Sequence, residues 1–116
     1  MINGIRKHSM LKIQFDTNQF LKDISKGKSY FHTFINKENL AAGIILLKPG
    51  DKDTQGPHDS DEIYYIIRGD GFLNIDGKDH SISEGMSYYV AKNIQHKFHG
   101  NKKELVVLYF FGGPDS

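Results

Sequence analysis

The chain has 116 residues, six of them histidine and none of them cysteine, and its 15 basic residues nearly balance its 14 acidic ones. This length fits one domain with a real core, and the absence of cysteine excludes disulfide frameworks and cysteine-based zinc ribbons. The near-neutral charge argues against a nucleic-acid or anionic-membrane surface, and no apolar run resembles a signal peptide or a membrane span. We therefore expect one soluble, cytoplasmic domain over residues 1–116 that binds neither nucleic acid nor membrane.

The predicted elements begin with one short helix and continue as strands. Over residues 17–26 apolar side chains recur at helical spacing, and either Asp16 or Thr17 can cap this segment. Runs rich in β-branched and aromatic residues follow, separated by Gly and Asn turn signals. They predict strands over residues 30–35, 40–47, 62–67, 72–75, 86–90, 95–98 and 105–111. The order predicts an all-β domain with a short N-terminal helical or irregular segment.

Two of the predicted strands are apolar on both faces. Residues 62–67 place large apolar or aromatic side chains at odd and at even positions, and residues 105–111 are apolar throughout. One face of each strand fills the core, so the other face needs a second layer or a partner molecule to cover it. The pattern therefore predicts a homodimer.

The most informative stretch contains a histidine and a glutamate four residues apart, His58 and Glu62. A helix would place them on one face, but Gly56, Pro57 and the polar turn former at residues 59–61 oppose a helix. A continuous strand would separate the two side chains by about 13 Å. A tight reversal after His58, with Glu62 opening the next strand, is the remaining geometry that brings imidazole and carboxylate together.

This stretch resembles the first motif of the cupin family of small β-barrels. That motif runs Gly, five residues, His-x-His, three or four residues, Glu, six residues and Gly. Gly50 opens it here, and His58, Glu62 and Gly69 take its later positions, whereas Gly56 stands where the first His belongs. The segment Asp-x-Gln-x-Pro-His that ends at His58 is also similar to a subgroup of single-domain bacterial cupins.

The second cupin motif runs Gly, five residues, Pro-x-Gly, two residues, His, three residues and Asn. Gly85 and His96 match it at the correct interval, whereas Ala91, Asn93 and Gly100 replace its Pro, Gly and Asn. Asn93 is a mild replacement, because asparagine tolerates the left-handed conformation that glycine would supply. The second motif is therefore recognisable but degraded.

The resemblance covers residues 40–112 and implies a double-stranded β-helix, a jelly-roll-like barrel with its core over residues 28–112. It also implies one divalent metal ion (Fe, Zn, Mn or Ni) inside the barrel, usually held by three His and one Glu. Carried over residue by residue, His58, Glu62 and His96 remain as the metal ligands. Two imidazoles and one carboxylate are a sufficient set for catalytic iron or zinc.

Gln55 is the polar side chain nearest to the gap left by Gly56. In a regular strand it would face away from His58, because positions an odd number of residues apart point to opposite faces. Only the Gly56–Pro57 step can turn it inward. We include Gln55 among the expected pocket residues.

Three further side chains are expected to line a pocket for a small organic ligand. Tyr64 shares the face of Glu62, Phe98 shares the face of His96, and His32 lies among aromatic residues on an early strand. Tyr64 carries a hydroxyl near the predicted metal, so it is the candidate for orienting a ligand or transferring a proton.

The remaining histidines have no predicted role in the site. His99 follows His96 by three residues in a predicted strand and therefore faces the opposite side. His80 lies in a polar hairpin and His8 in the basic N-terminal segment, so both are expected to face solvent.

These observations predict a small mononuclear metalloenzyme that acts on a small organic molecule. Members of the family include dioxygenases, isomerases and lyases, so the fold does not fix the reaction. Two alternatives belong to other classes: a non-catalytic module that binds a sugar or an organic acid, and a metal-free structural homodimer. Metal content and turnover distinguish the three.

Overall fold

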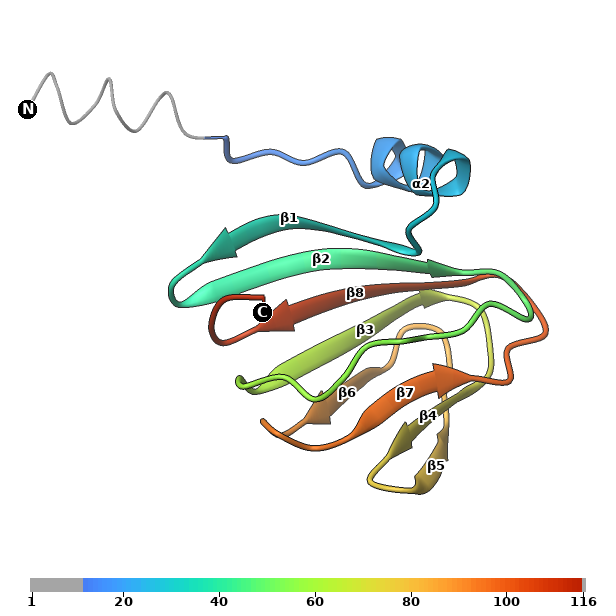
Figure 1. Ribbon diagram of the computed structural model, residues 1–116. Helices are drawn as coiled ribbons and strands as arrows, with labels where there is room; N and C mark the ends of the chain where they lie inside the picture. The colour runs from blue at the N-terminus through green and yellow to red at the C-terminus, as the bar shows by residue number, and fades with distance from the viewer. Residues whose placement is uncertain (1–11, 116) are drawn as a thin grey trace, which may run out of the picture.

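The computed structural model describes residues 12–115, which form one helix and eight strands in two antiparallel sheets (Figure 1). The larger sheet has the order β1-β2-β8-β3-β6 and the smaller one the order β5-β4-β7. The sheets face each other around the core, and the helix lies on the outer side of the larger sheet. The elements are α2 (Thr17–Lys26), β1 (Phe31–Lys37), β2 (Leu40–Leu47), β3 (Glu62–Arg68), β4 (Phe72–Ile75), β5 (Lys78–Ser81), β6 (Ser87–Val90), β7 (His96–His99) and β8 (Leu105–Phe111).

Helix α2 forms over the range that the sequence predicted. Asp16 is its N-cap, because the Asp16 carboxylate accepts a hydrogen bond from the backbone N–H of Gln19 at 3.1 Å. Ile24 is buried and packs with Ile44 of β2 on the outer face of the sheet. The structure thus selects Asp16 over Thr17 as the cap. No helix among residues 12–115 is long and apolar enough to cross a membrane.

The main core fills the space between the two sheets. Alternate residues of β8, among them Val107 and Tyr109, point into it. The opposite face of β2 and β8 packs under α2, through the buried cluster Ile24, Ile44, Leu46 and Val106. The helix therefore covers part of the apolar outer face from which we expected a partner molecule.

The predicted strands agree with the structure in order and place. β2, β4 and β8 have the predicted bounds, and β1, β3, β6 and β7 differ from prediction by one or two residues at one or both ends. β5 was not predicted, because its sequence KDHS contains no apolar residue. It forms because Asp76 and Gly77, with φ of 52° and 85°, make a tight hairpin turn that pairs it with β4.

Two turn residues of the predicted motifs have the backbone conformations that the motifs require. Asn93 has φ of 64°, so it adopts the left-handed conformation expected of it. Gly69 has φ of 112°, and a β-carbon there would lie 2.7 Å from the carbonyl oxygen of Glu104 and from the Cα of Leu105. Only glycine fits where β3 ends beside the start of β8.

Candidate metal centre

Segments that belong to both sheets meet at the candidate site. Glu62 is the first residue of β3 and His96 the first of β7, whereas His58 lies in the irregular segment that leads into β3. The backbone N–H of Asn93 donates a hydrogen bond to the carbonyl oxygen of His58 at 2.7 Å. The left-handed turn that precedes β7 therefore also holds the backbone at His58.

The structure brings the three predicted ligands together. One ligand atom each from His58, Glu62 and His96 lies within 4.8 Å of the others, and His96 Nε2 is 3.1 Å from Glu62 Oε1. The chain bends over residues 59–60 and enters β3 at Glu62, which is the predicted reversal. This cluster is consistent with a metal site.

His96 presents one ring nitrogen to the cluster. Its Nδ1 donates a hydrogen bond to the carbonyl oxygen of Ile94 at 2.9 Å, and since a carbonyl only accepts, Nδ1 carries the proton. In the neutral ring the lone pair is then on Nε2, and this is the tautomer in which Nε2 can bind a metal. Burial lowers the pKa of His96, but the Glu62 carboxylate, the Ile94 carbonyl and Asp53 together raise the pKa above its ordinary value. The surroundings of this ring therefore favour a positive charge.

Glu62 is a buried carboxylate that accepts no hydrogen bond. Its side chain is 1% exposed, and neither of its oxygens has a hydrogen-bond donor within the described part of the chain. The His96 ring nitrogen lies within ion-pair distance but is not aligned as a donor to this carboxylate. Burial of a carboxylate without full compensation costs on the order of several kcal/mol, so this site favours a bound cation.

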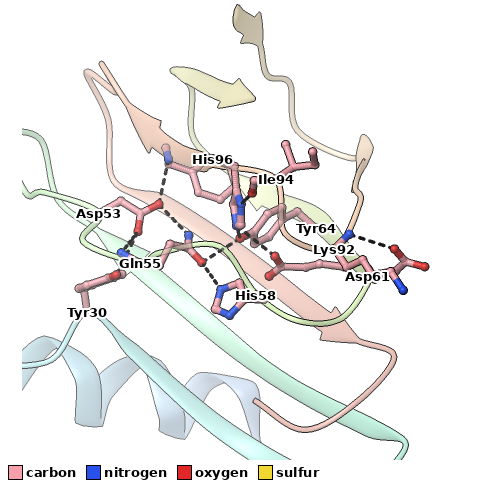
Figure 2. Close-up of polar contacts among 11 residues, drawn as sticks. Tyr30, Asp53, Gln55, His58, Asp61, Tyr64, Lys92, Ile94 and His96 are labelled. Atoms are coloured by element: carbon pink, nitrogen blue, oxygen red, sulfur yellow. Dashed lines mark hydrogen bonds and ion pairs between the residues drawn. The ribbon is translucent and has the colours of Figure 1, made fainter. Parts of the chain in front are cut away.

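Tyr64 links Gln55 to His96 inside the site (Figure 2). Its hydroxyl lies 3.0 Å from Gln55 Oε1 and 2.8 Å from His96 Nε2, and the same Gln55 oxygen lies 3.1 Å from His58 Nε2. Burial, reinforced by the Glu62 carboxylate, raises the pKa of Tyr64 well above its ordinary value. The phenol therefore stays protonated and can donate a hydrogen bond.

Gln55 points into the site, which regular strand alternation would not allow. The segment from residue 51 to residue 61 forms no strand, so alternation does not apply to it. Asp53 holds the side chain in place, because its Oδ2 accepts a hydrogen bond from Gln55 Nε2 at 2.7 Å. Sequence reasoning assigned Asp53 no role. The available signal was its position two residues before Gln55, since aspartate often bonds the backbone N–H two residues on, as it does here at 3.2 Å.

The other two expected pocket residues lie in different places. Phe98 is buried beneath the site and packs edge-on against Tyr64, with ring centroids 4.8 Å apart. The structure does not bring His32 to the site. His32 pairs with Ile44 across β1 and β2, on the α2 side of the sheet, and its ring centroid is 4.7 Å from that of Phe20.

The histidines without a predicted role lie away from the cluster. His99 points away from His96, as predicted, and its Nε2 lies 2.8 Å from Asp79 Oδ1. His80 is half-buried in β5 rather than fully solvated. His8 lies outside the described residues.

A small cavity opens beside the cluster. Its volume is about 60 Å³, and its lining includes Tyr30, Gln55, His58, Tyr109 and Asp115. Pockets for drug-sized ligands have volumes of roughly 300 Å³ or more, so this cavity suits a much smaller molecule. A larger hollow of about 320 Å³ between α2 and the end of β2 contains none of the three candidate ligands.

Comparison with known proteins identifies the family. Residues 43–111, which include all three candidate ligands, match the cupin domain. The chain belongs to the cupin family. The uncharacterized protein SCO3923 of Streptomyces coelicolor is 31% identical over 83 residues, which cover 72% of this chain and 79% of that protein. The resemblance seen in the two motifs is thus confirmed.

Solved cupin structures share the fold with little sequence identity. An RmlC-like cupin from Methanocaldococcus jannaschii, described as a double-stranded β-helix, has a TM-score of 0.72 at 18% identity, over 90% of this chain and 93% of that one. The DMSP lyase DddQ from Ruegeria pomeroyi has a TM-score of 0.65 at 18% identity, over 72% of this chain and 46% of that one. These likenesses confirm the predicted fold class, a mostly β double-stranded β-helix with one short N-terminal helix.

Proposed function

We propose that this cupin binds one divalent metal ion through His58, Glu62 and His96 and that it is a small mononuclear metalloenzyme. The observation that carries the proposal is the Glu62 carboxylate, which is 1% exposed, accepts no hydrogen bond from residues 12–115 and adjoins two imidazoles. A bound cation would supply the positive charge that this cluster favours.

The donor atoms restrict the kind of metal. Because the chain contains no cysteine, the site consists of nitrogen and oxygen donors, which suit Fe(II), Zn(II), Mn(II) and Ni(II). The chemistry that such an ion supplies is the polarisation of a substrate oxygen or the activation of water or dioxygen. Three protein ligands leave positions at which a substrate can bind.

Tyr64 is the residue that we assign to proton donation. Its hydroxyl is 2.8 Å from His96 Nε2, and burial together with Glu62 raises its pKa well above the ordinary value. It therefore acts as a hydrogen-bond or proton donor toward negative charge on a substrate oxygen, and it is not a base. Phe98 packs edge-on against its ring and limits its movement.

The cavity of about 60 Å³ favours a small organic substrate or a fragment of a larger one that enters end-on. The Ruegeria pomeroyi relative is a DMSP lyase, so the cupin fold supports lyase chemistry. For this chain the reaction class is a lyase, an isomerase or a dioxygenase. The alternative is a non-catalytic module that holds a small sugar or organic acid in the same cavity.

Elemental analysis of protein purified without a His-tag or chelator tests the proposal. We expect one divalent ion per chain in the wild type and its loss in His58→Ala and in His96→Ala. His99→Ala is the matched control, because it removes an imidazole from the outer face of the same strand β7. Substoichiometric metal that none of these substitutions changes would overturn the proposal.

Turnover assays on metal-loaded protein then separate the reaction classes. Substrate-dependent consumption of dioxygen indicates a dioxygenase, and activity that persists without dioxygen indicates an isomerase or a lyase. Stoichiometric metal without turnover across a broad panel of small organic molecules favours the non-catalytic module.

A further inference from the structure

The Asp53 carboxylate fixes the orientation of the Gln55 amide. Asp53 Oδ2 accepts hydrogen bonds from Gln55 Nε2 at 2.7 Å and from the backbone N–H of Phe98 at 2.9 Å. Its Oδ1 accepts from the Tyr30 hydroxyl at 3.0 Å and from the backbone N–H of Gln55 at 3.2 Å. A carboxylate only accepts, so the amide turns its NH₂ group toward Asp53 and its carbonyl oxygen away from it.

The carbonyl oxygen of Gln55 faces the metal cluster (Figure 2). Gln55 Oε1 lies 3.1 Å from His58 Nε2 and 3.0 Å from the Tyr64 hydroxyl. Two ligand atoms at right angles around one ion, each about 2.1 Å from it, are about 3.0 Å apart. The separation of Gln55 Oε1 from His58 Nε2 agrees with this value, and a bound ion would take the place of the proton that Nε2 donates to Oε1 in the metal-free protein. The 3.1 Å separation of His96 Nε2 from Glu62 Oε1 agrees with it as well.

The sequence leaves one ligand position of the family motif without its histidine. Gly56 has no side chain at the position of the first motif histidine, so only two imidazoles and one carboxylate remain. Gln55 is the adjacent residue, and the irregular path of residues 51–61 turns its side chain inward. Its amide oxygen therefore occupies the part of the site that lacks an imidazole.

We propose that Gln55 Oε1 is the fourth protein ligand of the metal ion, in place of the imidazole that Gly56 cannot supply. The inference rests on the proposed function, because it requires an ion held by His58, Glu62 and His96. An amide oxygen gives a donor set of two nitrogens and two oxygens, which favours Mn(II) and Fe(II) more than a set with three imidazoles does.

The proposal assigns Asp53 as a positioning residue. It holds the amide from behind, in the way that carboxylates behind metal ligands fix the orientation of those ligands. Its burial and its four donors leave it no free direction toward the site.

Titration of chelator-treated protein with Mn(II) and with Co(II) tests the inference. Gln55→Met keeps the length of the side chain and removes the amide. We expect it to weaken Mn(II) binding at least tenfold and to change the visible absorption spectrum of bound Co(II), because one donor atom is replaced. Gln19→Met is the matched control, since the Gln19 amide pairs with Asp23 at 3.0 Å on the exposed side of α2; it should leave both readouts unchanged.

A second variant distinguishes loss of a metal ligand from misfolding of Gln55→Met. Gln55→Glu retains an oxygen at the same reach but places a carboxylate beside Asp53. If residue 55 is a ligand, Gln55→Glu binds Mn(II) more tightly than Gln55→Met does, and its bound Co(II) keeps the absorption spectrum of a site with two nitrogen and two oxygen donors. If Gln55 only braces the segment, repulsion from Asp53 makes Gln55→Glu as defective as Gln55→Met, which contradicts the inference.

The positioning role of Asp53 has its own readout. In Asp53→Asn the side chain at residue 53 is an amide that can donate as well as accept hydrogen bonds, so it no longer holds the Gln55 amide in one orientation. We expect Mn(II) affinity to fall about tenfold, while the Co(II) spectrum at saturation stays that of the wild type because the donor atoms are the same. If Asp53→Asn binds Mn(II) as tightly as the wild type does, Asp53 does not position the Gln55 amide.

The same titrations separate failure of this inference from failure of the proposed function. A wild-type protein with no affinity for either ion overturns both. Binding that His96→Ala abolishes, while Gln55→Met keeps the wild-type affinity and Co(II) spectrum, overturns only the assignment of Gln55. The expected result is binding that His96→Ala abolishes and that Gln55→Met weakens at least tenfold, with an altered Co(II) spectrum in Gln55→Met.

Discussion

A single carboxylate dominates the electrostatics of the site. Glu62 is 1% exposed, and neither of its oxygens accepts a hydrogen bond from the part of the chain that the structure describes. In the metal-free protein this burial opposes folding, because the lost hydration of the carboxylate is not fully replaced. A bound cation compensates the charge of the buried carboxylate, so metal binding increases the free energy of unfolding.

Glu62→Gln is therefore expected to change stability and metal binding in opposite directions. Without the buried charge, the metal-free variant should unfold with a free energy higher than that of the wild type by about 1 kcal/mol or more. Mn(II) should stabilise the wild type but not the variant. Urea unfolding with a chelator and with Mn(II) measures both effects, and Glu38→Gln at an exposed turn is the control. A metal-free variant less stable than the wild type, or one still stabilised by Mn(II), contradicts this account.

At the scale of elements, apolar patterning was sufficient to predict the strands that build the core. β2 and β8 carry long apolar runs, and their bounds were predicted without error. β5 has no apolar residue and exists through its pairing with β4, so its only local signal was the Asp76–Gly77 turn. Which strands become neighbours in the two sheets depends on contacts distant in sequence, and the family motifs predicted the fold class but no strand order.

Prediction of the site reached its limit in the irregular segment before β3. Motif spacing was enough to predict His58, Glu62 and His96 as a cluster. The inward direction of Gln55 depends on backbone angles over residues 51–61 and on its bond to Asp53, and no periodicity encodes either. The outward direction of His32 depends similarly on the register of β1 against β2.

Two glycines at positive φ differ in the space around them: Gly77 in the β4–β5 turn and Gly69 at the end of β3. Substituting each of them tests how tightly the end of β3 packs against β8. Gly69→Ala and Gly77→Ala both place a β-carbon at positive φ, which costs about 1–2 kcal/mol. At Gly77 the β-carbon meets no atom within 4 Å, whereas at Gly69 it lies 2.7 Å from backbone atoms of β8 and the residue before it. Gly69→Ala should therefore lower the free energy of unfolding by clearly more than Gly77→Ala does. Equal effects in urea denaturation would show that the end of β3 can move away from β8.

At the scale of the whole molecule, the larger sheet has two apolar faces and only one of them lies inside the barrel. Helix α2 covers part of the outer face. Beyond the helix, four large side chains that are 38–61% exposed line an apolar hollow of about 290 Å³: Leu40, Ile63, Tyr89 and Phe110. Contiguous apolar surface of this kind is typical of an interface, and a two-fold homodimer is the commonest way to cover it.

We predict that the protein is a homodimer that buries this face, with Ile63 near its centre, between Tyr89 and Phe110 on the neighbouring strands. Ile63→Glu should convert the dimer to a 13.2 kDa monomer at micromolar concentration, because an unpaired carboxylate in the interface is costly to desolvate. Sedimentation velocity measures the change, and Ile13→Glu, at a side chain 77% exposed outside both sheets, is the control. Because Ile63 and Glu62 point to opposite faces of β3, metal content should be the same in Ile63→Glu and in the wild type, which distinguishes loss of the dimer from loss of the fold. A wild-type protein that sediments as a monomer contradicts the prediction.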